Sequence, residues 1–114
     1  MANSSSCIFC QIAAEQLPAE IVRIDDEFVA FRDVSPRAKT HVLVIPRSHV
    51  EHLDDFLADG GSSDRMLAFV RATAAEVGVE GQYRLVTNVG EAAGQVVPHL
   101  HWHILAGQRL PGFG

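Results

Sequence analysis

Three histidines occupy alternate positions near the end of the 114-residue sequence: His99, His101 and His103. Residues i, i+2 and i+4 of a β-strand share a face, so this spacing predicts three imidazoles on one face and core residues on the other. A neutral imidazole can attack phosphorus near physiological pH, while a second one donates to phosphoryl oxygens. A lone strand histidine is more often an ordinary polar residue, and His-x-His more often a metal pair. Three in register after Gly94-Gln95 favour catalysis.

The only two cysteines, Cys7 and Cys10, stand three residues apart. In a cytosolic protein such a pair is either a redox pair or half of a metal site, because structural disulfides rarely persist there. No thioredoxin-like strand precedes the pair, which makes the redox interpretation the weaker one. Zinc takes four nitrogen or sulfur ligands, so the other two ligands must come from elsewhere in the chain.

Hydrophobic periodicity and turn residues predict the elements that must position these side chains. A short helix is expected over residues 7–14, with Ser6 as its N-cap. Strand-like patterns cover residues 20–24, 28–33, 41–45, 83–88 and 98–105, and Pro46 is expected to stop the third of them.

One long helix is expected over residues 63–77, with Gly78 suited to its C-terminal cap. Its apolar stripe consists of Met66, Leu67, Val70, Ala74 and Val77. Strands joined by short connections around one long helix predict an α+β fold. We expect an antiparallel sheet of about five strands, one long and one short helix, and helices segregated to one face.

Length and composition restrict the classes of function. The chain is 47% hydrophobic and 20% charged, and 114 residues predict a single domain over 1–114, with an N-terminal tail at 1–6 and a flexible C-terminal tail at 107–114. Nine Lys and Arg against fourteen Asp and Glu give a net charge of −5, which argues against nucleic acid and anionic membranes as partners. The longest apolar run, 42–46, cannot span a bilayer, and we expect a cytoplasmic protein.

The segment from His99 to Leu105 resembles the His-φ-His-φ-His-φ-φ signature of the histidine triad family of nucleotide hydrolases and transferases. Supporting matches are Gly94-Gln95, Asn88, the segment 31–36 that looks like the family's nucleoside-binding segment, and 41–47, which looks like its central strand. The resemblance covers residues 7–105. It is greatest to the Hint branch, the purine nucleoside phosphoramidases, and it implies a HIT-like fold.

The resemblance implies a role for each matching residue. His101 would attack the α-phosphorus and form a nucleotidyl-imidazole that water resolves, while His103 contacts phosphoryl oxygens and His41 joins the network behind them. Asp33 would accept both ribose hydroxyls. The remaining nucleotide-binding residues would be Asn88, Gly94, Gln95 and Val96 around the phosphate, and Ile8, Phe9, Ile12, Phe31, Val34 and Leu43 around the base.

Two positions depart from the Hint pattern. Val96 stands where many members carry a serine that helps to protonate the leaving amine, and Arg32 stands where histidine is common. The leading hypothesis is hydrolysis of purine nucleoside 5′-phosphoramidates or related AMP-X compounds. The alternatives are hydrolysis of dinucleoside polyphosphates, a zinc-stabilised nucleotide-binding or interaction module with little turnover, and a metal buffer.

The same resemblance implies a metal site and a partner. In bacterial members that begin with Cys-x-x-Cys, His49 and His99 complete a zinc site with Cys7 and Cys10. We expect one structural zinc per chain, because four protein ligands leave no open position for water. The family also implies a homodimer joined through the long helix and a neighbouring strand. The sixth histidine, His52, is expected at the surface without a role.

Overall fold

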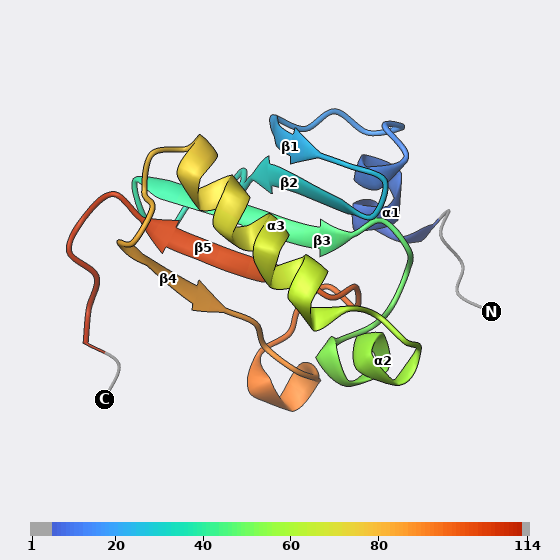
Figure 1. The fold of residues 1–114 in the computed structure, drawn as a ribbon. Helices are drawn as coiled ribbons and strands as arrows, with labels where there is room; N and C mark the ends of the chain where they lie inside the picture. The colour runs from blue at the N-terminus through green and yellow to red at the C-terminus, as the bar shows by residue number, and fades with distance from the viewer. Residues whose placement is uncertain (1–5, 113–114) are drawn as a thin grey trace.

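The computed structural model describes residues 6–112; the expected tail residues 1–5 and the final residues 113–114 lie outside the described part. The elements follow in the order α1 (Ile8–Ala13), β1 (Ile21–Ile24), β2 (Phe28–Arg32), β3 (Thr40–Pro46), α2 (Leu53–Ala58), α3 (Ser63–Glu76), β4 (Tyr83–Val86), the 3₁₀ turn η2 (Glu91–Ala93) and β5 (Trp102–Ala106) (Figure 1). The prediction of five strands and one long helix is confirmed.

The five strands form one antiparallel sheet in the order β1-β2-β3-β5-β4. β3 lies at its centre and pairs with β5, with Leu43 opposite His103 and Val42 opposite Ile104. Pro46 was expected to stop β3, but it is the last strand residue and pairs in register with Phe28. The pairing of β3 with β5 brings together segments that are far apart in the sequence, which local sequence patterns do not encode.

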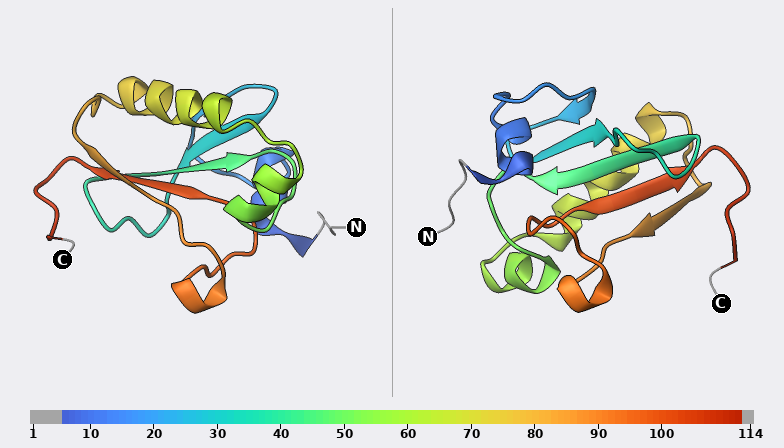
Figure 2. Two further views of the ribbon diagram at one scale, coloured as in Figure 1. Left: turned by 60° about the horizontal axis from the view of Figure 1, so that its bottom comes forward. Right: turned by 180° about the vertical axis from the view of Figure 1, so that it is seen from behind.

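The expectation that helices cover only one face of the sheet is wrong. α3 packs on one face with Ala30, Val42 and Ile104 in a first core cluster, whereas α1 packs on the opposite face with Phe31 and Leu43 in a second cluster (Figure 2). β2 and β3 are buried at nearly every position, because their consecutive apolar residues face both ways. A central strand without polar alternation needs cover on both faces.

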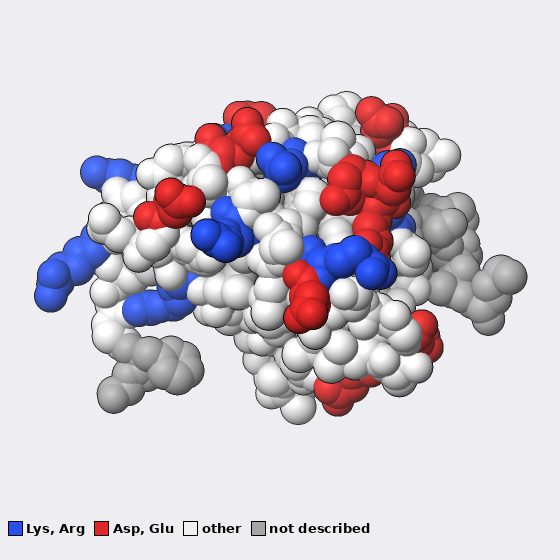
Figure 3. Space-filling model, viewed as in Figure 1, with Lys and Arg blue, Asp and Glu red and all other residues white. Residues whose placement is uncertain are grey.

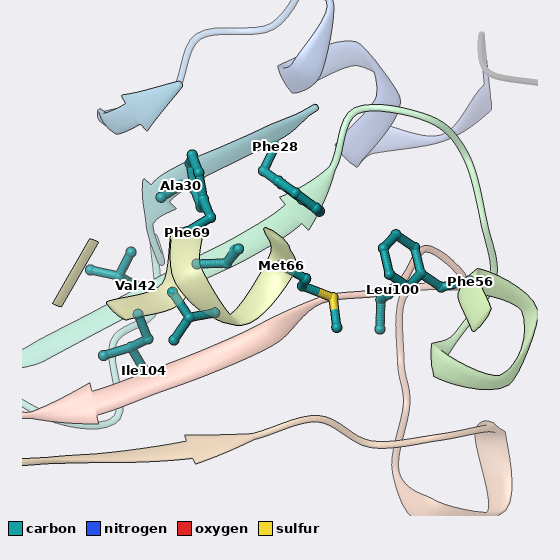
Figure 4. Packing of buried hydrophobic residues seen from close by; sticks show 10 residues of the cluster. Phe28, Ala30, Val42, Phe56, Met66, Phe69, Leu100 and Ile104 are labelled. Carbon is teal, nitrogen blue, oxygen red and sulfur yellow. The ribbon is translucent and has the colours of Figure 1, made fainter. Parts of the chain in front are cut away.

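The long helix α3 is capped at both ends. Ser62 accepts a hydrogen bond from the Arg65 backbone N–H at 3.1 Å, and Gly78 follows the C-cap with φ +77°, a left-handed conformation that glycine adopts without strain. The buried stripe contains Phe69 rather than the expected Leu67, which is 46% exposed. Met66 packs between α3 and the sheet beside Phe28 and Leu100 (Figure 4).

Two helical segments between the strands were not predicted from the sequence. α2 begins after His52 and buries only Phe56, and η2 buries none of its three residues. Such short helices present too few apolar positions for a periodic pattern to show. α2 covers the end of the first core cluster through Phe56, whose ring lies 6.2 Å from that of Phe28.

On the face that carries α3, positive and negative side chains are interspersed, and several are paired, including Arg65 with Glu27 at 2.7 Å and Arg23 with Glu76 at 3.1 Å (Figure 3). This mixed charge offers no continuous cationic surface on that face for a nucleic-acid backbone. No helix within residues 6–112 is long and apolar enough to cross a membrane.

Candidate active site and metal cluster

The first two histidines of the triad precede the strand that was expected to hold them. β5 begins at Trp102, and residues 99–101 are irregular. Backbone and side-chain hydrogen bonds hold this segment: Leu100 N–H donates to Val50 O at 2.8 Å, and the Thr87 hydroxyl donates to His101 O at 2.7 Å. Leu100 still points into the α3 core, so the alternation predicted for the triad is preserved without strand pairing.

His101 is fixed by its own neighbour. Its Nδ1–H donates to the backbone carbonyl of His99 at 2.8 Å, which leaves Nε2 as the ring nitrogen available for attack. The Phe9 ring packs edge-on against the imidazole with centroids 5.1 Å apart. Burial lowers the pKa of His101 below its ordinary value, although the His99 carbonyl opposes this. The imidazole is therefore neutral at pH 7, the form that a nucleophile requires.

A chain of hydrogen bonds sets the tautomer of His103. The Arg37 backbone N–H donates to His41 Nδ1 at 3.0 Å, so the His41 proton is on Nε2. That nitrogen lies 2.9 Å from His103 Nδ1 and donates to it. The His103 proton is consequently on Nε2, where it can serve as a donor. Burial, followed by the charges of nearby His101, His41 and Arg37, lowers the pKa of His103 to about 4.

Asp33 completes this chain of polar groups. Its Oδ2 lies 3.4 Å from His41 Nε2, and its Oδ1 accepts the Ser35 backbone N–H at 2.8 Å. Burial lowers the pKa of His41, while the Asp33 carboxylate partly offsets this effect. Asp33, His41 and His103 also bring three potential metal ligands together. His41 Nε2 and His103 Nδ1 are hydrogen-bonded to each other, so we interpret the three residues as a hydrogen-bonded network rather than a metal site.

A pocket of about 340 Å³ opens in front of His101 and His103. All but one of the thirteen predicted nucleotide-binding residues line it: Ile8, Phe9, Ile12, Phe31, Asp33, Val34, Leu43, Asn88, Gly94, Val96, His101 and His103. Three of these, Ile8, Val34 and Val96, are among the exposed large hydrophobic residues of the described chain, and Val34 is 96% exposed. Apolar side chains gathered at a pocket mouth are typical of a ligand or partner site.

Gln95 is the exception. Its carboxamide accepts the Gly90 backbone N–H at 2.8 Å and donates to the carbonyls of Val97 and Glu51, and it does not line the pocket. Gln95 therefore fastens the loop that follows β4. Gly94, at φ +100°, lines the pocket in a left-handed conformation that favours glycine.

The pocket also contains residues that the sequence did not point to. Leu17, Pro18 and Ala19 line it from the connection between α1 and β1, and Arg37 lines it from the β2–β3 loop. Among described residues, no ion pair of the Arg37 guanidinium is found. The only indication of Arg37 in the sequence was that it lies in the same short loop as Asp33.

A second cluster joins Cys7, Cys10, His49 and His99, whose potential ligand atoms all lie within 4.8 Å of one another; we call it the metal cluster. His99 Nδ1 lies 3.3 Å from Cys7 Sγ and 3.5 Å from Cys10 Sγ, and His49 Nδ1 lies 3.2 Å from Cys10 Sγ. Both cysteines are buried and not joined by a disulfide. The predicted residues thus meet from α1, the end of β3 and the segment before β5.

The donor set of the metal cluster fits zinc. Tetrahedral zinc with its usual bond lengths separates sulfur and nitrogen ligands by about 3.6 Å, close to the separations of 3.2–3.5 Å in the cluster. His99 Nε2–H donates to Pro46 O at 2.8 Å, which directs the unprotonated Nδ1 toward the sulfurs. Burial lowers the pKa of His99 to about 4, so this ligand is neutral.

Burial and the adjacent Cys7 raise the pKa of Cys10 to about 11. A thiol in such surroundings stays protonated unless a cation compensates the thiolate charge. Cys7 also caps α1, because its Sγ accepts the Cys10 backbone N–H, whereas Ser6 was expected to be the cap. The cluster is compatible with a zinc site on these grounds.

Comparison with known proteins agrees with this geometry. The HIT domain family matches residues 14–110. An uncharacterized HIT-like protein of Synechococcus elongatus is 43% identical over 108 residues, which cover 94% of this chain and 95% of that protein. The structure resembles a histidine triad protein from Clostridium difficile (35% identity, TM-score 0.86, all of both chains). It also resembles a HIT family hydrolase from Legionella pneumophila (35% identity, TM-score 0.81, 93% of this chain and 96% of that one).

Proposed function

We propose that this chain, which belongs to the HIT domain family, hydrolyses purine nucleoside 5′-phosphoramidates or related AMP-X compounds through a nucleotide covalently attached to His101. The observation that supports this proposal is that the two imidazoles at the pocket carry their protons on different ring nitrogens. His101 has its Nδ1 proton bound to a carbonyl and Nε2 available, whereas His103 has its proton on Nε2. One is prepared to attack and the other to donate.

The pocket supports a nucleoside monophosphate as the bound part of the substrate. Phe31, Leu43 and Ile12 provide an apolar wall for a base, and Asp33 keeps acceptor capacity on both carboxylate oxygens for ribose hydroxyls. Asn88 and Gly94 line the same pocket as the two histidines, where amide N–H groups can donate hydrogen bonds to a phosphate. A volume of about 340 Å³ is in the range of small-ligand pockets.

The chemistry requires two displacements at phosphorus. His101 Nε2 supplies the electron pair for a new N–P bond, and the bond from phosphorus to X breaks with its electrons leaving on X. The Nδ1–H remains hydrogen-bonded to the His99 carbonyl, and this bond stabilises the positive charge that develops on the imidazole. Water then attacks phosphorus, loses a proton to solvent and returns the electron pair to Nε2. His103 Nε2–H donates to the phosphoryl oxygens in both steps.

The leaving group is the point where Val96 matters. Val96 is 85% exposed and has no proton to give, so X must leave either as a weak base or with a proton from solvent. A neighbouring cavity of about 740 Å³ shares Ile8, Val96 and Val97 with the nucleotide pocket and provides space for X. It also carries Glu51, Asp55 and Asp59. These carboxylates repel a polyphosphate, which disfavours dinucleoside polyphosphates as substrates.

The test is release of AMP from adenosine 5′-phosphoramidate, with adenylyl sulfate and a diadenosine polyphosphate assayed on the same sample. His101→Ala should abolish turnover and leave AMP binding nearly intact. His52→Ala is the matched control, since His52 precedes α2 and lines neither the nucleotide pocket nor the metal cluster. Equal turnover in wild type and His101→Ala would end the proposal. Nucleotide binding without turnover of any substrate would instead support a binding module.

Three further proposals accompany this function. The metal cluster holds one structural zinc, because its four ligands leave no position for a reactive water. The chain forms a homodimer through α3 and the edge strand β4, where Leu67 is exposed, and light scattering tests the mass. The protein is cytoplasmic, where reducing conditions keep both thiols free for metal.

A further inference from the structure

We propose that the metal cluster positions the nucleophile, so that metal loading controls turnover at His101 in addition to stabilising the fold. The inference rests on the proposed role of His101. It concerns His99, which takes part in two sites at once: its side chain belongs to the metal cluster and its backbone carbonyl accepts the His101 Nδ1–H. His99 is thus a positioning residue, because it acts on the reaction only through His101.

The connection through His99 is short and rigid. The imidazole is fully buried, with Nε2 bound to Pro46 O at 2.8 Å and Nδ1 beside both sulfurs. On the main chain, His99 N–H donates to Val97 O at 2.8 Å. Fixing the ring at both nitrogens fixes the peptide that follows it, and that peptide carries the carbonyl facing His101. A small movement of this carbonyl changes the angle of attack of His101 Nε2.

A second connection runs through α1. Cys7 caps this helix and Cys10 lies in its first turn, so a metal bound to both sulfurs fastens α1 to His99 and His49. Between the two cysteines stands Phe9, whose ring contacts His101 edge-on at 5.1 Å and His99 at 5.9 Å. The metal cluster therefore positions the His101 imidazole in two ways: through the packing of Phe9 and through the hydrogen bond to the His99 carbonyl.

Without the metal, the four side chains of the cluster lose the ion that would join them. Only the sulfur–nitrogen contacts of 3.2–3.5 Å then connect Cys7 and Cys10 to the two imidazoles. α1 has just six residues, too few to remain helical without tertiary support. We expect α1 to loosen first, which releases Phe9 from His101 and the His99 carbonyl from its fixed position.

The test removes one metal ligand that lies outside the nucleotide pocket; because His49 also lines the neighbouring cavity, the NMR signal of His101 is read beside turnover. His49→Gln deletes a nitrogen ligand, and His49 does not line the nucleotide pocket. The matched control is Val70→Ala, which opens a space in the α3 core on the other face and leaves the metal cluster intact. Each protein is assayed for zinc content, kcat, KM and the NMR signal of the His101 Nδ1–H. Fluorescence of Trp102, the only tryptophan, reports on folding of the α3 core.

In metal-depleted His49→Gln with native Trp102 fluorescence, we expect the Nδ1–H signal to broaden or vanish and kcat to fall roughly 10–100-fold, more than KM rises. Val70→Ala should keep the signal and kcat within about twofold. An unchanged signal and kcat in folded, metal-depleted protein would overturn the inference. If His49→Gln does not fold, chelation of wild type and readdition of zinc replaces it. Unfolding of the chelated protein as a whole would also overturn it, because the metal would then act only on stability.

The proposed function and this inference fail in different ways. If zinc-loaded wild type releases no AMP, the proposed reaction is wrong, yet the Nδ1–H signal still shows whether the cluster fixes His101. If wild type releases AMP and folded metal-depleted protein does so equally well, the reaction stands and the positioning role is refuted.

Discussion

Replacing His41 tests how the second imidazole of the active site acquires its proton arrangement. His41 is 3% exposed, accepts the Arg37 N–H and donates to His103. His41→Phe keeps a buried ring of similar size but has neither a donor nor an acceptor. His103 Nδ1 and the Arg37 N–H then lose their partners, which should lower the free energy of unfolding by about 1–3 kcal/mol.

The effect on turnover is expected to be of the same order. His103 without its donor is free to rotate and to exchange tautomers, so the Nε2–H no longer points reliably at the phosphoryl oxygens. A loss of about 1.4–2.8 kcal/mol of transition-state stabilisation corresponds to roughly 10–100-fold in kcat. His41→Gln can both accept and donate, and should therefore retain more turnover than His41→Phe.

The assay is AMP release with kcat and KM determined for wild type, His41→Phe and His41→Gln, beside denaturant unfolding of each. Nitrogen-15 NMR of His103 provides a direct check, since the structure requires a pyridine-type Nδ1 and a pyrrole-type Nε2. Turnover of His41→Phe within twofold of wild type, or the opposite tautomer at His103, would refute this proton arrangement.

Three other predictions concern stability and leaving groups. The pKa of His103 is lowered to about 4 in the folded protein from an ordinary 6.5, so the unfolded chain binds the proton more tightly. The free energy of unfolding therefore falls as the pH falls from 6.5 to 4. In denaturant unfolding at these two pH values, His103→Gln should remove up to about 3 kcal/mol of that loss. Val96→Ser should raise kcat on adenosine 5′-phosphoramidate by tenfold or more relative to adenylyl sulfate, and equal effects on both would contradict the leaving-group argument. Met66→Ala, at a fully buried site, should lower the free energy of unfolding by about 2–5 kcal/mol without changing KM.

The number of strands, the three alternating histidines and the Cys-x-x-Cys pair could be predicted from the sequence because all of them rest on local patterns. Alternation, turn residues and the glycine at the C-terminal end of α3, Gly78, are encoded within a few positions. The metal ligands and the pocket residues were named through the family resemblance, and the structure brings each of these groups together. The role predicted for Gln95 at the phosphate stays a prediction; the structure shows its carboxamide bonded to the Gly90, Val97 and Glu51 backbone, which a Gly-Gln pair does not indicate.

The faces of the sheet could not be predicted in the same way. Continuous apolar runs such as those of β2 and β3 need cover on both faces, but they do not indicate which element provides it, and only the assembled sheet shows that α1 covers the face opposite α3. α2 and η2 are too short to leave a periodic pattern. The irregular backbone at residues 99–101 was hidden because its side chains alternate as those of a strand do.

That irregular backbone helps to explain why His101 and His103 have different environments. His103 lies in β5, and its tautomer is set by His41 of the neighbouring strand β3. His101 lies before the strand, where the carbonyl of His99 is free to accept a side-chain proton instead of a strand partner's N–H. Extending β5 back to His99 would engage that carbonyl in the ladder and remove the anchor of His101. The late start of the strand therefore leaves the His99 carbonyl available to His101, and under the proposed mechanism an engineered change that lengthens β5 should lower AMP release even where it raises the free energy of unfolding.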